Sequence, residues 1–178
     1  MGIVSSTAGH GGGNNGKVKN KQAQADGDQN NGPEDANHSQ TLWILIFRGY
    51  PRDIQSGRAT ELYIVFDDNE SKNLTIRIQG QHPNFSVEEV WNQAPPRTRP
   101  HFFRRLAVAT VETSSELDTR LRDAILSTHV NNTEADWTCQ SWVGDVLTAL
   151  QDARLITVEE GDNALNGMVN YIARAPWQ

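Results

Sequence analysis

Thr41-Leu42-Trp43-Ile44-Leu45-Ile46-Phe47 is an almost wholly apolar run with the length of a buried strand. Residues 62–66 (Leu-Tyr-Ile-Val-Phe) form a second such run, apolar on both faces. Residues 74–79 alternate between apolar and polar side chains, which is typical of a half-buried strand. The polar stretch 67–71 separates the last two runs, so these residues predict a β-hairpin.

The chain continues with one further strand signal and several helical ones. Residues 105–112 predict a fourth strand. Ser86-Val87-Glu88-Glu89 has the pattern of a capping box, and Pro95 allows only a short helix after it. Apolar spacing from residue 117 to 125 predicts a helix capped by Ser114 or Ser115.

Two more helices are predicted in the last quarter of the chain. One covers about residues 137–150, and the other carries apolar residues from 164 to 172, with Pro176 beyond its end. Strands therefore dominate the first half of the domain and helices the second. This segregated order favours an α+β fold, in which a mainly antiparallel sheet packs on helices.

The first 40 of the 178 residues differ sharply from the rest in composition. Residues 1–40 are rich in Gly, Asn and Gln and contain no Phe, Trp, Tyr or Leu. Such a segment cannot bury enough apolar surface to offset chain entropy, so we predict a disordered tail. Residues 41–178 then form a single domain of ordinary size.

The sequence also bears on location and on classes of partner. The formal net charge of −6 argues against nonspecific binding of nucleic acid. No signal peptide or membrane-spanning run is present, which predicts a cytoplasmic protein. Met1-Gly2-Ile3-Val4-Ser5-Ser6 fits the pattern for N-myristoylation at Gly2, and a short lysine cluster follows at residues 17–21. The alternatives are peripheral membrane association through this N-terminus and a plain flexible leader.

The only cysteine, Cys139, lies in the motif Trp137-Thr138-Cys139-Gln140-Ser141-Trp142-Val143. A thiol in the first turn of a helix lies near unpaired backbone N–H groups, which stabilise a thiolate. Cys139 also falls on an apolar stripe with Val143, Val146 and Leu150, which is typical of a small core residue. A single cysteine excludes an intramolecular disulfide, and we expect no metal site and no cofactor.

A catalytic thiol needs a general base within hydrogen-bonding reach. His82 follows the predicted third strand and is the most plausible base for Cys139, ahead of His101 and His129. Gln140 and Gln79 are candidates for polar support of such a site. For each histidine the alternative is an ordinary surface residue.

A local concentration of arginines surrounds Pro100. It consists of Arg97, Arg99, Arg104 and Arg105. Guanidinium groups bind carboxylates and phosphates through paired hydrogen bonds, so these residues are candidates for an anion site. The alternative is a solvated loop and strand edge.

The motif around Cys139 resembles an uncharacterised fungal protein group in which a Trp-Asn-Cys-Gln-Asn-Trp-Val-like sequence ends a small α+β domain. The resemblance covers about residues 41–176 and implies no activity. More remotely, the element order is similar to that of the circularly permuted NlpC-type peptidases and lecithin retinol acyltransferase-like enzymes. That resemblance implies a papain-like fold with Cys139 as the nucleophile.

In those enzymes the catalytic histidine begins a strand before the cysteine helix. The corresponding run here, Thr60-Glu61-Leu62-Tyr63-Ile64, has no histidine. Either His82 replaces it from the next strand, or the fold persists without the chemistry. We therefore expect a non-catalytic intracellular binding or scaffold domain, and the alternative is a cysteine-dependent hydrolase or acyltransferase using Cys139.

Overall fold

A computed structural model describes residues 38–177. Five strands form one antiparallel sheet in this part of the chain, in the order β4-β3-β2-β1-β5. The strands are β1 (His38–Phe47), β2 (Ala59–Phe66), β3 (Asn69–Gln79), β4 (Ser86–Trp91) and β5 (Phe102–Thr113). Two short 3-10 turns, η1 (Gln55–Gly57) and η2 (Pro96–Thr98), lie in the connections.

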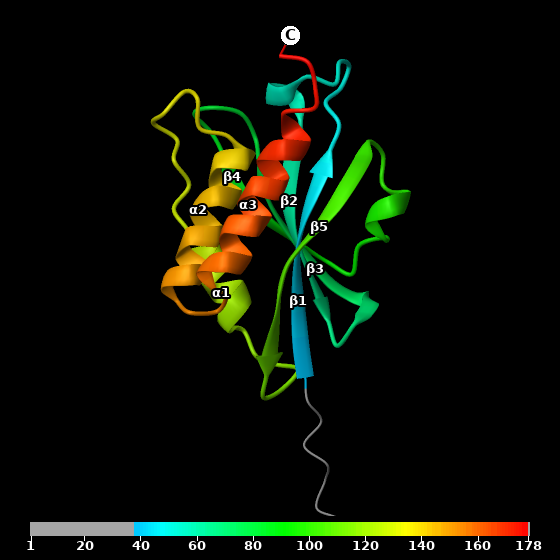
Figure 1. The fold of residues 1–178 in the computed structure, drawn as a ribbon, viewed down its shortest axis with the longest axis vertical. Helices are drawn as coiled ribbons and strands as arrows, with labels where there is room; N and C mark the ends of the chain where they lie inside the picture. Colours follow the sequence, from blue (N-terminus) through cyan, green and yellow to red (C-terminus); the bar gives the residue numbers. More distant parts are fainter. Residues whose placement is uncertain (1–37, 178) are drawn as a thin grey trace, which may run out of the picture. The chain divides into compact units, whose positions relative to one another are not determined.

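Three α-helices of the described region follow the sheet in sequence and cover one of its faces (Figure 1). They are α1 (Arg120–Ser127), α2 (Cys139–Asp152) and α3 (Val158–Ile172). Between helices and sheet lies the main core, in which Leu42, Ile44, Leu62 and Ile64 meet the fully buried Trp142. The predicted α+β class with a mainly antiparallel sheet is confirmed.

The opposite face of the sheet has a smaller core and a covering loop. Leu45, Tyr63 and Val65 point to this face and are buried. Strands β4 and β5 lie at opposite edges of the sheet, so the chain between them must cross it. Arg99 of this connection reaches Glu61 of β2 and lies over the ring of Phe47, which shows that the crossing runs over this second face.

One helix prediction was wrong, and a second helix is present but begins later than predicted. Residues 86–91 form strand β4. Their backbone pairs with β3, and the side chain of Glu88 forms an ion pair with Arg77 of β3. The helix expected after Ser114 or Ser115 begins at Arg120, and Leu117, expected in its core face, is 87% exposed. The predicted hairpin at residues 67–71 is confirmed, with Asp67 and Asp68 both at positive φ in the turn.

β1 begins at His38, three residues before the expected start of the domain at 41. The tail predicted for residues 1–40, including Gly2 and the lysine cluster, otherwise lies outside the described residues. In the described part of the chain, no helix combines the length and the apolar character that a bilayer crossing requires.

Candidate functional site

Cys139 is the first residue of helix α2. The preceding residue, Thr138, caps the helix by accepting a hydrogen bond from the backbone N–H of Gln140 at 3.2 Å, and Ser141 accepts one from Thr138 at 3.2 Å. The predicted apolar stripe is buried at Val143 but not at Cys139, whose side chain is half-buried. Cys139 therefore lies at the margin of the core.

The two glutamines proposed as polar support have other positions. Gln140 Nε2 donates to the carbonyl oxygens of Gln55 at 3.0 Å and Arg58 at 2.8 Å. These bonds tie the start of α2 to the connection between β1 and β2. Gln79 is exposed at the end of β3. Gln140 thus holds two parts of the fold together, and the structure does not bring Gln79 to Gln140.

The histidines considered as bases all lie on exposed loops. His82 is in the turn between β3 and β4, His101 packs against Tyr50 with ring centroids 5.3 Å apart, and His129 follows α1. Within residues 38–177, no hydrogen bond joins the Cys139 sulfur to an imidazole. Thr60 is buried in β2 with its hydroxyl unpaired within the described region.

Three of the four predicted anion-site arginines line one pocket. Arg97, Arg104 and Arg105 surround a cavity of about 320 Å³ together with Glu70 and aromatic residues of β5. Arg105 pairs with Glu70 at 2.7 Å, whereas residues 38–177 offer no ion-pair partner to Arg97 or Arg104. This arginine pocket therefore has two uncompensated positive charges in a chain whose net charge is −6.

The fourth arginine, Arg99, belongs to a neighbouring cavity on the outer face of the sheet. Its guanidinium pairs with Glu61 at 2.6 Å, and Arg77 pairs with the same carboxylate at 3.2 Å. One terminal nitrogen of Arg99 is buried without a hydrogen-bond partner in the described region. The sequence run of four arginines is therefore divided between two cavities.

A β-bulge shapes the arginine pocket. β1 pairs Ile46 with Arg104 and Phe47 with Phe102, so Phe103 is an extra residue in β5. A bulge redirects the side chains beside it, and here both Phe103 and Arg104 contact Tyr171 of α3. The irregular strand thus carries Arg104 to the helix side while Arg105 stays on the outer face, over Trp43.

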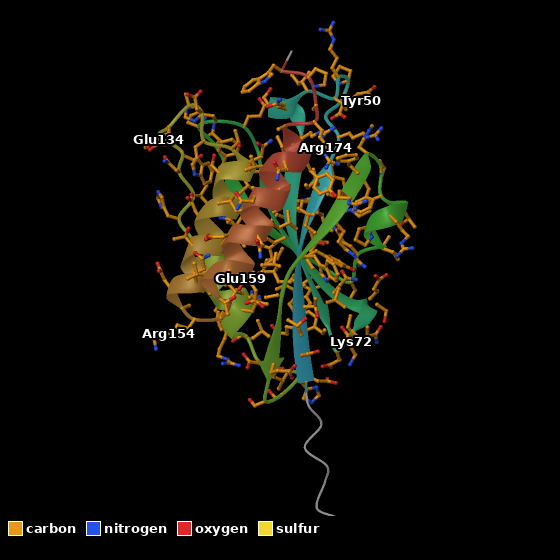
Figure 2. All side chains as sticks on the ribbon, in the orientation of Figure 1. Tyr50, Lys72, Glu134, Arg154, Glu159 and Arg174 are labelled. Carbon is orange, nitrogen blue, oxygen red and sulfur yellow. The ribbon has the colours of Figure 1, made fainter. Side chains whose placement is uncertain are left out.

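Beside the pocket, four arginines pack on two aromatic rings. Arg48 and Arg58 lie over Phe103, with guanidinium carbons 5.1 and 4.5 Å from the ring centroid. Arg104 and Arg174 lie over Tyr171 in the same way, at 5.1 and 4.4 Å. We call these six residues the arginine–aromatic cluster. In Figure 2, Arg174 marks the end of the fold at which α3 terminates, and Arg154 lies at the other end.

One carboxylate anchors this cluster. Asp53 accepts hydrogen bonds from Arg58 at 2.8 and 2.7 Å, and Arg48 approaches it to 4.0 Å. The hydrogen bond from Arg58 is the main cause that lowers the pKa of Asp53, against the opposing effect of burial. Arg58 also donates to the backbone oxygen of Tyr171, so it joins the loop after β1 to α3.

The arrangement suits binding of an anion. Guanidinium groups that rest on aromatic rings are pre-oriented, so less side-chain entropy is lost when a phosphate or carboxylate binds. Arg48, Arg174 and Tyr171 could not be identified from the sequence as members of this cluster, because only the fold brings them to β5. The run Phe102-Phe103-Arg104-Arg105 was the sequence signal for an irregular strand. In a regular strand with one buried face, apolar and charged residues alternate, whereas here two aromatic residues are followed by two arginines.

One group of side chains in the described region could hold a metal ion. Ligand atoms of His38, Asp67 and Glu116 lie within 4.8 Å of one another. His38 and Asp67 are already hydrogen-bonded at 3.3 Å, and Lys72 pairs with Glu116 at 3.1 Å. These contacts account for the cluster as ordinary surface pairing.

The chain was compared with models of protein families, with curated proteins and with solved structures, and none of them matched it.

Proposed function

We propose that the domain is a non-catalytic intracellular binding domain that takes an anionic group, a phosphate or a carboxylate, in the arginine pocket. The observation that carries the proposal is that Arg97 and Arg104, with no carboxylate partner within residues 38–177, line the same cavity as Arg105. Pairs of guanidinium groups are the usual protein ligands for such anions.

The surroundings of the pocket add two supports. The arginine–aromatic cluster shares Phe103 and Arg104 with the pocket, so the positive charge continues along the surface. The cluster contains four guanidiniums, and pairing with the carboxylate of Asp53 beside it leaves three positive charges. A cavity of this size accommodates one small anionic group of a larger partner.

Calorimetric titration with inorganic phosphate at constant ionic strength tests this proposal. Wild-type protein should bind phosphate, and Arg104→Gln should weaken binding by about tenfold, since each charge-assisted pair contributes about 1.5–3 kcal/mol. Arg154→Gln is the matched control, because Arg154 is an exposed arginine at the other end of the fold. Equal affinities of the Arg104 and Arg154 variants would contradict the proposal.

The second candidate function is a cysteine-dependent hydrolase or acyltransferase on a papain-like fold. The half-buried thiol of Cys139 at the start of α2 favours it. The absence of a hydrogen-bonded base in the described region favours the non-catalytic function. Hydrolysis of p-nitrophenyl acetate that disappears in Cys139→Ser and in His82→Ala would establish catalysis. An identical rate in both variants and the wild type would exclude it for this ester.

We also propose that the protein is cytoplasmic and that acylation of Gly2 would bring it to membranes. A single myristoyl chain binds membranes only marginally, so a basic surface would add the second attraction. Co-sedimentation with vesicles containing phosphatidylserine should then require both Gly2 and Arg174, and should weaken with salt. A protein that stays in the soluble fraction with an unmodified Gly2 would exclude the membrane role and leave only the proposed anion site.

A further inference from the structure

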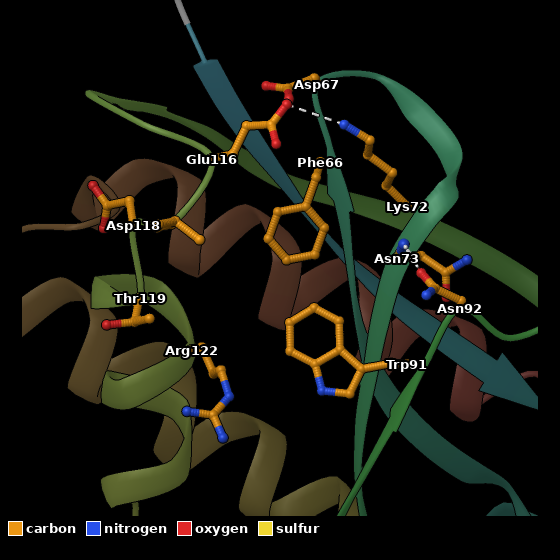
Figure 3. A pocket seen from close by; sticks show the side chains of 11 residues that line it. Phe66, Asp67, Lys72, Asn73, Trp91, Asn92, Glu116, Asp118, Thr119 and Arg122 are labelled. Carbon is orange, nitrogen blue, oxygen red and sulfur yellow. Dashed lines mark hydrogen bonds and ion pairs between the residues drawn. The ribbon is translucent and has the colours of Figure 1, made fainter.

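A second pocket, which shares no residue with the arginine pocket, has a flat aromatic floor (Figure 3). Phe66 ends β2 and Trp91 ends β4, and their rings are nearly parallel, at 19°, with centroids 5.7 Å apart. Figure 3 shows the two rings side by side with their faces visible. They form a continuous apolar surface beneath a cavity of about 340 Å³, which lies within the size range of small-molecule sites.

Polar groups form the rim of this pocket, and four of its charged side chains, Lys72, Glu116, Asp118 and Arg122, are already in ion pairs. Lys72 pairs with Glu116 at 3.1 Å, and Arg122 pairs with Glu89 of β4 at 2.6 Å. Asp118 accepts from Arg120 at 2.7 Å. A charged ligand would have to break one of these pairs, so the rim favours a neutral one.

The pocket is an open shelf. Trp91 is 53% exposed, and Leu117, which also lines the pocket, is 87% exposed. A wholly apolar or aromatic ligand gains most when nearly all its surface is enclosed, which this shelf does not provide. A ring with one apolar face and a polar periphery fits better, because the exposed side remains hydrated.

Unused hydrogen-bonding groups lie at the edge of the shelf. The indole N–H of Trp91 and the side-chain N–H groups of Asn92 donate no hydrogen bond to residues 38–177. Glu116 uses one carboxylate oxygen for Lys72, which leaves its second oxygen as an acceptor. Unused donors and an unused acceptor therefore lie beside an apolar floor, and ring hydroxyl groups can bond to both kinds of group.

We infer that this shelf binds a neutral carbohydrate through one pyranose ring. The C–H face of the ring would lie on Trp91 and Phe66, and its hydroxyl groups would bond to Asn92 and Glu116. The inference does not depend on the anion site, since the two pockets have no residue in common.

The test follows the tryptophan indole and backbone amide resonances of the ¹⁵N-labelled full chain during titration with methyl β-D-glucopyranoside and with cellobiose, and the amides of Asn92 and Glu116 report binding to the Trp91→Ala variant. The Trp91 signal should shift and saturate, while that of Trp177, also exposed, should not. Trp91→Ala should weaken binding by about tenfold, as loss of an aromatic contact does, and Trp177→Ala should leave it unchanged. Asn92→Ala is a second variant that keeps the floor and should also weaken binding.

Adenosine serves as the flat aromatic competitor. Saturable binding of adenosine without binding of either pyranoside would overturn the carbohydrate assignment. Pyranoside shifts that persist in Trp91→Ala would overturn the assignment of the floor. Absence of any Trp91 shift with both pyranosides would overturn the inference as a whole.

Discussion

Arg104 and Arg174 share the ring of Tyr171, with their guanidinium carbons 5.1 and 4.4 Å from its centroid. One arginine comes from β5 and the other from the segment just after α3, and neither has a carboxylate partner within residues 38–177. Two like charges beside one ring repel each other, and a bound anion would relieve this repulsion. The packing of α3 against β5 therefore places a second arginine beside Arg104, which lines the proposed anion site.

Replacement of Tyr171 should weaken phosphate binding without a change of charge. Tyr171→Leu removes the ring on which both guanidiniums rest, so affinity should fall several-fold, in keeping with about 0.5–1 kcal/mol for an exposed cation–π contact. Tyr171→Phe keeps the ring and should bind as the wild type does. Calorimetric titration with phosphate measures both. If the Tyr171→Leu and Tyr171→Phe variants bind phosphate with the same affinity, the ring does not orient the arginines.

Acid should destabilise the domain through Asp53. Its pKa is lowered in the folded state, mainly by the hydrogen bond from Arg58. The carboxylate therefore stabilises the fold above its unfolded pKa of about 3.9, and the contribution is lost as pH falls through the folded value. Asp53→Asn should cost about 1–3 kcal/mol at neutral pH and flatten the pH dependence of unfolding below pH ~4.

The control for this measurement is Asp162→Asn, because Asp162 is exposed on α3 and has no ion-pair partner in the described part of the chain. Chemical denaturation between acidic and neutral pH reports both variants. If the stability of Asp53→Asn still falls with acid as steeply as that of the wild type, other carboxylates dominate the pH dependence. Asp67 and Asp118 are the candidates, because their pKa values are also lowered.

Gln140 should matter for stability more than its place beside Cys139 suggests. Gln140→Ala removes the side-chain donor to the carbonyl groups of Gln55 and Arg58, which should cost about 1–3 kcal/mol, although the Gln55 carbonyl keeps a hydrogen bond from the backbone N–H of Arg58 at 3.3 Å. Gln81→Ala, at an exposed residue of the β3–β4 turn, should cost almost nothing. Thermal unfolding compares the two. Similar melting temperatures would mean that water replaces the Gln140 amide at no cost.

The neighbouring thiol should be only a minor contributor to stability. Because Cys139 is half-buried, Cys139→Ser should change the unfolding free energy by less than about 1 kcal/mol. Iodoacetamide should label Cys139 in the folded protein at neutral pH. Labelling that requires denaturant would instead assign the thiol to the core stripe, as its spacing with Val143 predicted.

The sequence allowed β1, β2, β3, β5, the two long helices and the fold class to be predicted, since those features depend on local apolar periodicity. Residues 86–91 were predicted as a helix because a capping-box pattern is a local signal. Pairing with β3 and the Glu88–Arg77 and Glu89–Arg122 ion pairs override it. Contacts of this kind join residues that are 11 and 33 positions apart, so no local window contains them.

The convergence of the candidate anion-site arginines was predicted in part, for a similar reason. Its arginines are close in sequence, and three of them do line one pocket. Which of them converge depends on the bulge at Phe103, and a bulge is set by pairing with β1 and not by the strand alone. Arg174 is distant in sequence and reaches the cluster only because α3 packs against β5.

The central claim is that the arginine pocket binds an anion, and the most direct test observes its guanidinium groups themselves. The measurement follows the Nε–Hε resonances of the arginine side chains during titration of the full chain with inorganic phosphate at constant ionic strength. The predicted result is a saturable shift of Arg97, Arg104 and Arg105, with Arg154 and Arg120 unchanged. Equal small shifts of all arginines, or shifts that never saturate, would contradict the claim, because they would indicate only general screening by salt.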